Sequence, residues 1–169
     1  MSHTAFLFAF LLLFASTNIS CEQTSHKKKS VDNFLPVTKV VDGDTFWADN
    51  GTQKGIKIRL IGVDAPESRN SFRKVVGYYG KEAKAYLTKL LTGKKVKLVF
   101  DVDSIDQYGR TLAYVYLEDG TFVNADLMKS GYAMVMTVPP NIKFADKFVK
   151  LQNEARQNKR GLWKISNHK

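Results

Sequence analysis

The sequence has a single cysteine, fewer acidic than basic residues, and no Lys, Arg, Asp or Glu in its first twenty positions. One cysteine cannot form a disulfide within the chain, so a folded domain has to depend on its apolar core. Hydrophobic residues make up 44% and aromatic residues 12% of the 169 residues, which excludes wholesale disorder. We find no internal repeat. The length fits one domain of ordinary size plus an extension.

The uncharged N-terminus is typical of an export signal. Its apolar run, Ala5 to Ala15, is too short to span a bilayer but has the length of a signal-peptide apolar region. The run ends in small and polar residues before Cys21, as in a bacterial lipoprotein signal, although Asn18 stands where such signals favour an aliphatic residue. We expect residues 1–20 to be a signal peptide and Cys21 to be lipidated at the cell envelope. Simple secretion after cleavage near Ser20 and a retained anchor are the alternatives.

The charge of the chain lies entirely beyond this segment. All 26 basic and 16 acidic residues fall after position 20, and the net charge is +10. Such an excess attracts polyanions, either nucleic acid or an anionic membrane surface, and does not choose between them. Residues 21–33, with Lys27 to Lys29 in the middle, are typical of a solvated polar tether.

From Phe34 onward the pattern predicts short strands and a few helices. Apolar residues alternate between turns rich in Asp, Asn and Gly, and later recur at helical spacing. This order predicts an α+β, β-rich fold, a five-stranded barrel of the oligonucleotide-binding (OB) type with about three helices. We expect strands at Val37–Val41, Thr45–Ala48, Lys54–Val63, Val96–Val102, Leu112–Leu117 and, briefly, Thr121–Val123, and helices at Gly80–Leu91, Ala125–Ser130 and around Phe144 to Ala155.

Four polar clusters interrupt this pattern. The stretch from Arg59 to Glu67 is the most informative, because an apolar run carrying an arginine ends in two carboxylates and a proline. These residue types suit a metal-assisted attack on a phosphate, but a strand followed by a polar turn gives the same pattern. The other clusters are Asp42–Thr45, Asp106–Arg110 and the pair Lys94–Lys95, for which turns and an ordinary surface pair are the alternatives.

Together, in this order, the clusters resemble the staphylococcal nuclease family. The resemblance runs from Phe34 to Trp163. Its motifs are Asp-Gly-Asp-Thr at 42–45, Arg-Leu-Ile-Gly-Val-Asp-Ala-Pro-Glu at 59–67, Tyr-Gly-Arg-Thr-Leu-Ala-Tyr-Val-Tyr at 108–116 and Arg-Gly-Leu-Trp at 160–163. We therefore expect one nuclease-like domain at residues 34–165 and a tail at 166–169.

The resemblance implies a calcium site and a general base. Asp44, Asp64 and the backbone carbonyl of Ala65 match the family's ligands for one Ca²⁺, and oxygen ligands suit this hard cation. Glu67 matches the residue placed to activate a water molecule.

The resemblance also implies how the substrate is held. Arg59 and Arg110 match two catalytic arginines that grip the phosphate, and a guanidinium can donate two hydrogen bonds to phosphate oxygens. Tyr108 matches a phosphate-contacting tyrosine, and Lys94 and Lys95 match a basic pair near the terminal phosphate. These last three residues are expected to position the substrate.

One departure from the family concerns the nucleotide. The family's best-known member has two tyrosines on the loop after the second helix, whereas residues 136–140 contain none. Tyr132 lies nearby in the sequence and either compensates or belongs to the core. The departure leaves nucleotide affinity and base preference open, and it leaves the expected metal and arginine residues intact.

The expected function is an exported, calcium-dependent endonuclease, a monomer that hydrolyses DNA and RNA with little sequence preference and leaves 3′-phosphate products. The alternative is a non-catalytic OB-fold module that binds single-stranded nucleic acid or another polyanion at the cell surface. The intact carboxylates favour the enzyme, because carboxylates beside a phosphate repel it unless a cation lies between them.

Overall fold

The computed structural model describes residues 34–70 and 77–164. The predicted signal peptide, the tether with Cys21 and the tail at 166–169 lie outside the described residues. Within the described part of the chain, no helix is both long enough and apolar enough to cross a membrane.

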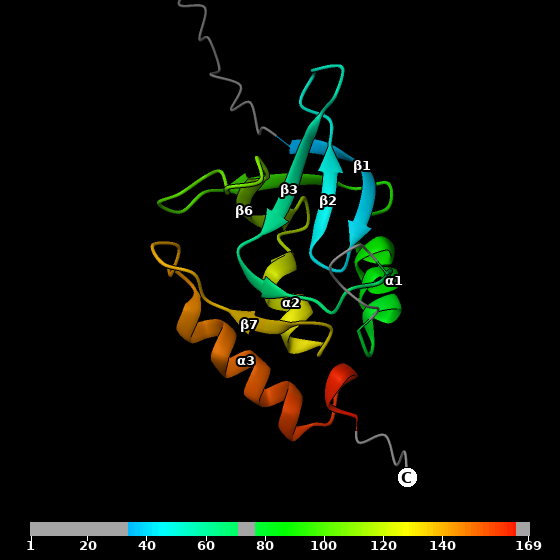
Figure 1. Cartoon of the computed structure of the whole chain (residues 1–169), viewed down its shortest axis with the longest axis vertical. Coiled ribbons are helices and arrows are strands. Elements are labelled where there is room, and N and C mark those ends of the chain that lie inside the picture. Colours follow the sequence, from blue (N-terminus) through cyan, green and yellow to red (C-terminus); the bar gives the residue numbers. More distant parts are fainter. Residues whose placement is uncertain (1–33, 71–76, 165–169) are drawn as a thin grey trace, which may run out of the picture. The chain divides into compact units, whose positions relative to one another are not determined.

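Five strands form a closed barrel, as the sequence predicts (Figure 1). They are β1 (Phe34–Asp42), β2 (Thr45–Ala48), β3 (Ile56–Leu60), β5 (Lys95–Val99) and β6 (Thr111–Leu117). Their order around the barrel is β1-β2-β3-β6-β5, and β5 closes it by pairing with β1. All neighbours are antiparallel except β3 and β6, which run parallel and place Arg59 opposite Leu112. The parallel pair brings the expected site residues of two distant motifs to one end of the barrel.

The apolar run that contains β3 continues into a second strand, which belongs to another sheet. The single strand predicted at Lys54–Val63 is therefore wrong. The chain bends at Gly62, whose φ of +75° is a conformation that glycine adopts without strain. A Cβ atom at this position would lie 2.6 Å from Cε2 of Phe148. Beyond the bend, β4 (Gly62–Asp64) pairs with β7 (Met134–Met136), a strand that the sequence pattern does not reveal.

Three α-helices accompany the barrel, α1 (Gly80–Leu91), α2 (Val123–Lys129) and α3 (Ala145–Gln157), and a short 3₁₀ turn, η1 (Gly161–Trp163), follows them. The predicted bounds of α1 are confirmed. The short strand predicted at Thr121–Val123 is wrong, because only one bridge joins Phe122 to Tyr116 before α2 begins. Figure 1 shows α1 beside β1, and α3 beneath α2 and β7.

The core contains one buried amide that ties a helix to the barrel. Asn124, at the start of α2, is fully buried. Its Nδ2 donates a hydrogen bond to the carbonyl of Ile61 at 2.9 Å, and its Oδ1 accepts one from the N–H of Val115 at 2.9 Å. Since Ile61 is the residue between β3 and β4, Asn124 holds the bend from inside the core.

Candidate active site

Asp44 occupies the turn between β1 and β2, and its side chain is almost entirely buried. Its Oδ2 accepts a hydrogen bond from the N–H of Ala65 at 3.1 Å, and its Oδ1 accepts one from the hydroxyl of Thr45 at 2.8 Å. The turn and the segment after β4 approach so closely that a Cβ at Gly43 would lie 2.6 Å from the Cβ of Ala65. Asp44 therefore has a fixed orientation against the segment that carries the second carboxylate.

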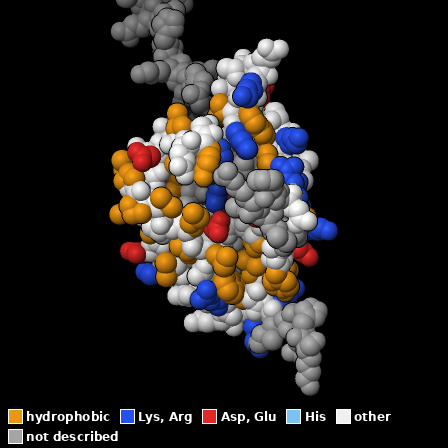
Figure 2. All heavy atoms as spheres, viewed as in Figure 1, with side chains coloured by type: hydrophobic (Ala, Val, Ile, Leu, Met, Phe, Trp, Pro, Cys, Tyr) orange, Lys and Arg blue, Asp and Glu red, His pale blue; other side chains and the backbone are white. Residues whose placement is uncertain are grey.

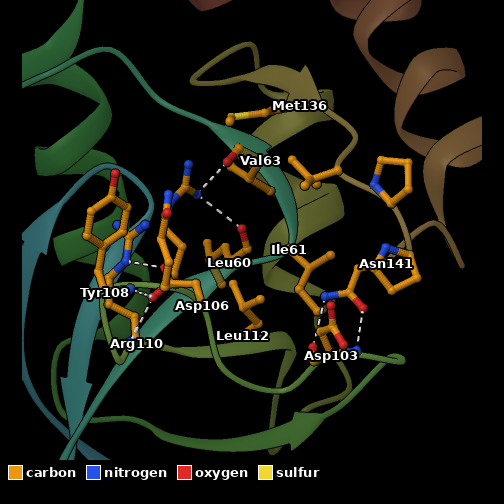
Figure 3. Close-up of a pocket in the computed structure, with 16 residues that line it drawn as sticks. Leu60, Ile61, Val63, Asp103, Asp106, Tyr108, Arg110, Leu112, Met136 and Asn141 are labelled. Carbon is orange, nitrogen blue, oxygen red and sulfur yellow. Dashed lines mark hydrogen bonds and ion pairs between the residues drawn. The ribbon is translucent and has the colours of Figure 1, made fainter.

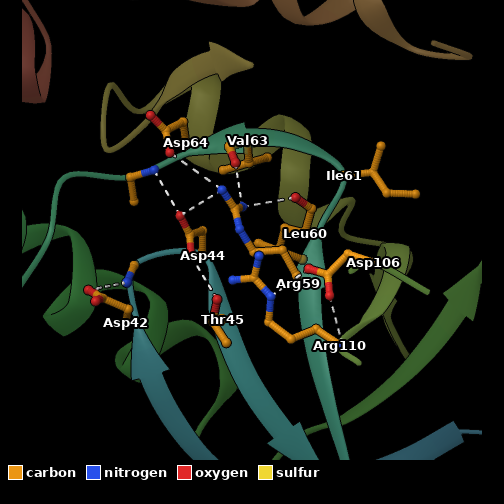
Figure 4. A network of polar contacts seen from close by, with 12 residues as sticks. Asp42, Asp44, Thr45, Arg59, Leu60, Ile61, Val63, Asp64, Asp106 and Arg110 are labelled. Atoms are coloured by element: carbon orange, nitrogen blue, oxygen red, sulfur yellow. Dashed lines mark hydrogen bonds and ion pairs between the residues drawn. The ribbon is translucent and has the colours of Figure 1, made fainter. Parts of the chain in front are cut away.

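Arg59, on β3, places its guanidinium between two carboxylates (Figure 4). Its Nη2 lies 3.2 Å from Oδ2 of Asp44 and 3.4 Å from Oδ1 of Asp64. Its Nη1 donates hydrogen bonds to the carbonyls of Leu60, at 3.1 Å, and Val63. Because these carbonyls belong to the two sides of the bend, the bend itself forms the socket for the guanidinium.

The two carboxylates converge as a cation site requires. Asp44 and Asp64 both lie within 3.4 Å of one nitrogen of Arg59, so the guanidinium balances one of their two negative charges. Carboxylate oxygens, with the carbonyl of Ala65 next in the chain, form a donor set that fits calcium. The described residues hold no group of three or more His, Cys, Asp or Glu side chains arranged for a metal. A cation at this position would therefore depend on two carboxylates, a carbonyl and water.

The backbone around Glu67 is fixed on two sides. The N–H of Ser68 donates to Oδ1 of Asp42 at 3.1 Å, which joins this segment to the β1–β2 turn. The carbonyl of Glu67 accepts a hydrogen bond from the N–H of Gly77 at 3.0 Å. A Cβ at Gly80 would overlap the same carbonyl, so the first residue of α1 lies directly against Glu67.

Arg110 precedes β6 and is oriented by a neighbouring carboxylate. Its Nε donates to Oδ2 of Asp106 at 2.6 Å, and Oδ1 of Asp106 accepts from the N–H groups of Tyr108 and Arg110 at 2.9 Å. Burial raises the pKa of Asp106, but these hydrogen bonds outweigh it and bring the pKa below its ordinary value. The Nη atoms of Arg110 bond to no residue within 34–70 or 77–164, and the guanidinium lies over the Tyr108 ring at 5.4 Å.

A pocket of about 250 Å³ is lined by both arginines (Figure 3). Arg59, Arg110 and Tyr108 line one side of it, and the loop after β7 forms another wall with Met136 and Val138. The pocket thus combines two guanidinium groups with an apolar surface.

Two hydrogen bonds between Asn141 and the backbone of Asp103 hold the loop after β7 in place. The N–H of Asp103 donates to Oδ1 of Asn141 at 2.8 Å, and Nδ2 of Asn141 donates back to the carbonyl of Asp103 at 2.8 Å. Asn141 is buried and lines the pocket. Sequence reasoning missed this residue, because an asparagine after two prolines gives only a turn signal.

Tyr132 is part of an aromatic stack and does not line the pocket. Its ring lies 4.0 Å from that of Tyr86 and 5.6 Å from that of Tyr79, measured between centroids, and it packs against the core. Of the two interpretations of Tyr132, the structure favours a core residue over a replacement for the missing loop tyrosines.

Lys94 and Lys95 lie away from the other expected residues. Lys95 begins β5, where Val96 pairs with Leu117 at the end of β6. Arg110 lies at the opposite end of β6, and a strand of seven residues spans roughly 20 Å. The structure therefore gathers Asp44, Arg59, Asp64 and Arg110 with the segment of Ala65 and Glu67, but not the two lysines.

Comparison with known proteins identifies the family of the chain. The family described as "Staphylococcal nuclease homologue" matches residues 57–165, more than half of the chain. The chain belongs to the staphylococcal nuclease family. It is 40% identical over 141 residues to a thermonuclease of Staphylococcus intermedius, covering 81% of this chain and 82% of that protein. A thermonuclease of Staphylococcus hyicus is 40% identical over 128 residues, with coverage of 75% and 73%.

A third relative is named as an endonuclease. Endonuclease YncB of Bacillus subtilis (strain 168) is 35% identical over 147 residues, which cover 86% of this chain and 67% of that protein. The predicted family, the barrel fold and the enzyme class, a hydrolase of phosphodiester bonds, are thus confirmed for this staphylococcal nuclease family member. The roles of the individual site residues stay predictions.

Proposed function

We propose that this chain is a calcium-dependent endonuclease that hydrolyses both DNA and RNA and leaves 3′-phosphate products. The observation that supports it is the convergence of Asp44 and Asp64 on one nitrogen of Arg59, whose side chain lines a pocket together with Arg110. Two converging carboxylates with two guanidinium groups suit phosphoryl chemistry and have no evident use in a core. A module that only binds polyanions has no need of carboxylates facing its ligand.

The two arginines differ in their availability. Arg110 is held through Nε by Asp106, so its outer edge is free to donate two parallel hydrogen bonds to phosphate oxygens. Arg59 is engaged by Asp44 and Asp64, and it turns to the phosphate when another cation neutralises these carboxylates. Both charges strengthen their contacts as negative charge builds up on the phosphate in the transition state.

Asp44, Asp64 and the carbonyl of Ala65 would hold the calcium ion, which supplies Lewis-acid stabilisation of the phosphate and a template for in-line attack. Asp44 is the rigid member of this set, because its side chain is 11% exposed and accepts two hydrogen bonds. Asp64 has a side chain that is 43% exposed and adjusts more easily.

Glu67 orders and deprotonates the attacking water in this proposal. A new oxygen–phosphorus bond forms as the bond from phosphorus to the 5′-oxygen breaks, so the phosphate stays on the 3′ side. The fixed backbone around Glu67 supports the role, since a general base needs a defined position beside the reacting phosphate.

Little sequence preference follows from the pocket walls. Met136 and Val138 offer dispersion contacts that any base can make, and the amide of Asn141 is already bonded to Asp103. The absence of tyrosines from residues 136–140 lowers the expected nucleotide affinity without touching the two arginines.

Digestion of plasmid, single-stranded DNA and RNA with calcium, and then with chelator, tests the activity. Cleavage of all three in calcium, its loss with chelator, and 3′-phosphate ends on the products are expected. No cleavage in calcium, or equal cleavage with chelator, contradicts the proposal. Absence of cleavage would favour the alternative function, a non-catalytic module that binds polyanions.

The variant Glu67→Gln tests the base. We expect kcat to fall by about 10²–10⁴-fold while binding of single-stranded DNA is retained. Glu118→Gln is the matched control, because Glu118 is exposed at the far end of β6 and should leave kcat unchanged. Loss of binding together with activity in Glu67→Gln would assign Glu67 a structural role instead.

We also propose that the chain is exported and acts as a monomer. The proposal rests on the uncharged apolar segment and Cys21, which lie outside the described residues. Mass measurement of the processed N-terminus separates a lipidated Cys21 from a simple cleavage product, and an intact Met1 contradicts removal of a signal peptide. Light scattering of the purified protein tests the monomer.

A further inference from the structure

A basic groove follows the outward face of α1, on a surface that the proposed site does not use. Its walls are Ser68, Arg69 and residues of α1 at positions 81, 84, 85, 88 and 89. These positions recur at intervals of three and four, so they share one face of the helix. Figure 2 shows Lys and Arg side chains, with an acidic one among them, on the right-hand edge of the molecule, the side on which α1 lies in Figure 1.

The groove is basic throughout. Four of its seven lining residues, Arg69, Lys81, Lys84 and Lys89, are cationic, and none is acidic. Glu82, the acidic residue of α1, is close to Tyr79 and does not line the groove. Lys81 and Lys84 are neighbours on the helix and repel each other, which lowers the stability of the helix. A bound polyanion would remove this repulsion.

The groove begins beside the proposed active site. Ser68 and Arg69 directly follow Glu67, and the N–H of Ser68 is bonded to Asp42 in the turn that carries Asp44. At the other wall, Gly80 lies against the carbonyl of Glu67, and Lys81 is the next residue. The groove therefore starts at the residue that follows Glu67 in the sequence, and the first turn of α1 lies against the Glu67 backbone.

We propose that this groove binds the phosphates of the substrate strand beyond the cleaved bond. The proposal rests on the proposed nuclease function and names its substrate class, a polynucleotide rather than a dinucleotide. From Lys81 to Lys89 the helix rises about 12 Å, which covers about two to three phosphates at 3.4 Å or more per phosphate. Lysines neutralise phosphates without reading bases, in keeping with a nuclease of low sequence preference.

The test compares a long with a short substrate in two variants of equal charge. The groove variant carries Lys81→Gln, Lys84→Gln and Lys89→Gln. The control variant carries Lys129→Gln, Lys150→Gln and Lys164→Gln, which remove three exposed charges from other parts of the surface. The substrates, cleaved in calcium, are a single strand of twenty nucleotides and a dinucleotide with one phosphodiester.

For the groove variant we expect KM for the long strand to rise about tenfold at low salt, with kcat unchanged. The slope of log KM against log salt should fall by about 2, since each single-strand phosphate contact contributes about 0.7. Kinetics on the dinucleotide should stay the same, which a distortion of the active site would not allow. An equal loss in both variants, or an unchanged preference for the long strand, overturns the proposal.

Binding of the long strand in chelator, followed by fluorescence anisotropy, separates the groove from catalysis. If the unaltered chain cleaves neither substrate, the proposed function fails, while weaker binding by the groove variant alone still supports the groove. Binding to anionic phosphatidylglycerol vesicles tests the competing explanation, which is that the groove binds a membrane surface. If the groove variant loses vesicle binding and keeps oligonucleotide binding, the groove faces a membrane and the proposal is wrong.

Discussion

Replacing Asn124 with alanine tests how the framework of the active site is held. The change removes the amide that bonds to the N–H of Val115 and the carbonyl of Ile61, both at 2.9 Å. Both groups stay buried and lose their partner. Each unsatisfied buried group costs about 1–3 kcal/mol, and the missing side-chain volume adds to this. Alanine's higher helix propensity offsets about 0.5 kcal/mol.

The free energy of unfolding should therefore fall by about 3–5 kcal/mol, a large part of the roughly 5–15 kcal/mol that stabilises a domain. Urea denaturation followed by tryptophan fluorescence measures it. Asn153→Ala is the matched control, since Asn153 is exposed in the middle of α3 and gains the same helix propensity without losing a buried bond.

The control should change stability by no more than about 0.5 kcal/mol. A loss below about 1 kcal/mol in Asn124→Ala would refute the reasoning, because two unsatisfied buried groups cannot cost so little. Since Ile61 joins β3 to β4, the variant should also lose activity under conditions where it remains folded.

Three further changes test other parts of the structure. Asp106→Asn removes the ion pair that orients Arg110 and should lower kcat about tenfold to hundredfold with little change in melting temperature; unchanged kcat would contradict an orienting role. Gly62→Ala imposes a side chain at φ +75° against Phe148 and should cost about 2–4 kcal/mol in urea denaturation, whereas a neutral effect would mean that the bend shifts freely. Burial of the hydroxyl and, to a smaller extent, its hydrogen bond to the Asp126 carboxylate raise the pKa of Tyr86 to about 12. The unaltered protein should therefore lose stability relative to Tyr86→Phe as the pH rises from about 10 to 12, and parallel pH profiles would exclude this.

The first two strands, β1 and β2, and helix α1 could be predicted because their signals are local. The turn at Asp42–Asp44 and the apolar face of Gly80–Leu91 each occupy one short stretch, and the structure gives α1 the predicted bounds. The bend at Gly62 has no such signal, since the residues around it continue an apolar run. Phe148, far away in the sequence, fills the space that a side chain at position 62 would need, so the bend requires glycine.

In the candidate site, too, the sequence predicts the residue types, while the fold decides which of them meet. The ordered motifs supplied Asp44, Asp64 and Arg110. The antiparallel pairing of β2 with β3 brings Asp44 to Arg59, and the parallel pairing of β3 with β6 brings Arg110 to the same end of the barrel. Lys94 and Lys95 came from the same resemblance, yet Lys94 precedes β5 and Lys95 begins it, at the other end of the barrel. A motif specifies residue types, while the direction of each strand decides which of them meet.

Arg59 links the fold of this site to its chemistry. Without a bound cation, its guanidinium is the positive charge that allows two carboxylates to lie together at a half-buried position. In the proposed mechanism the same carboxylates would hold calcium, so the guanidinium and the metal would compete for one place. In the proposed mechanism this competition makes Arg59 available to the phosphate only when the metal is present, whereas Arg110 is available throughout. The carbonyls of Leu60 and Val63 keep Arg59 at the bend in either case, so the exchange requires no rearrangement of the barrel.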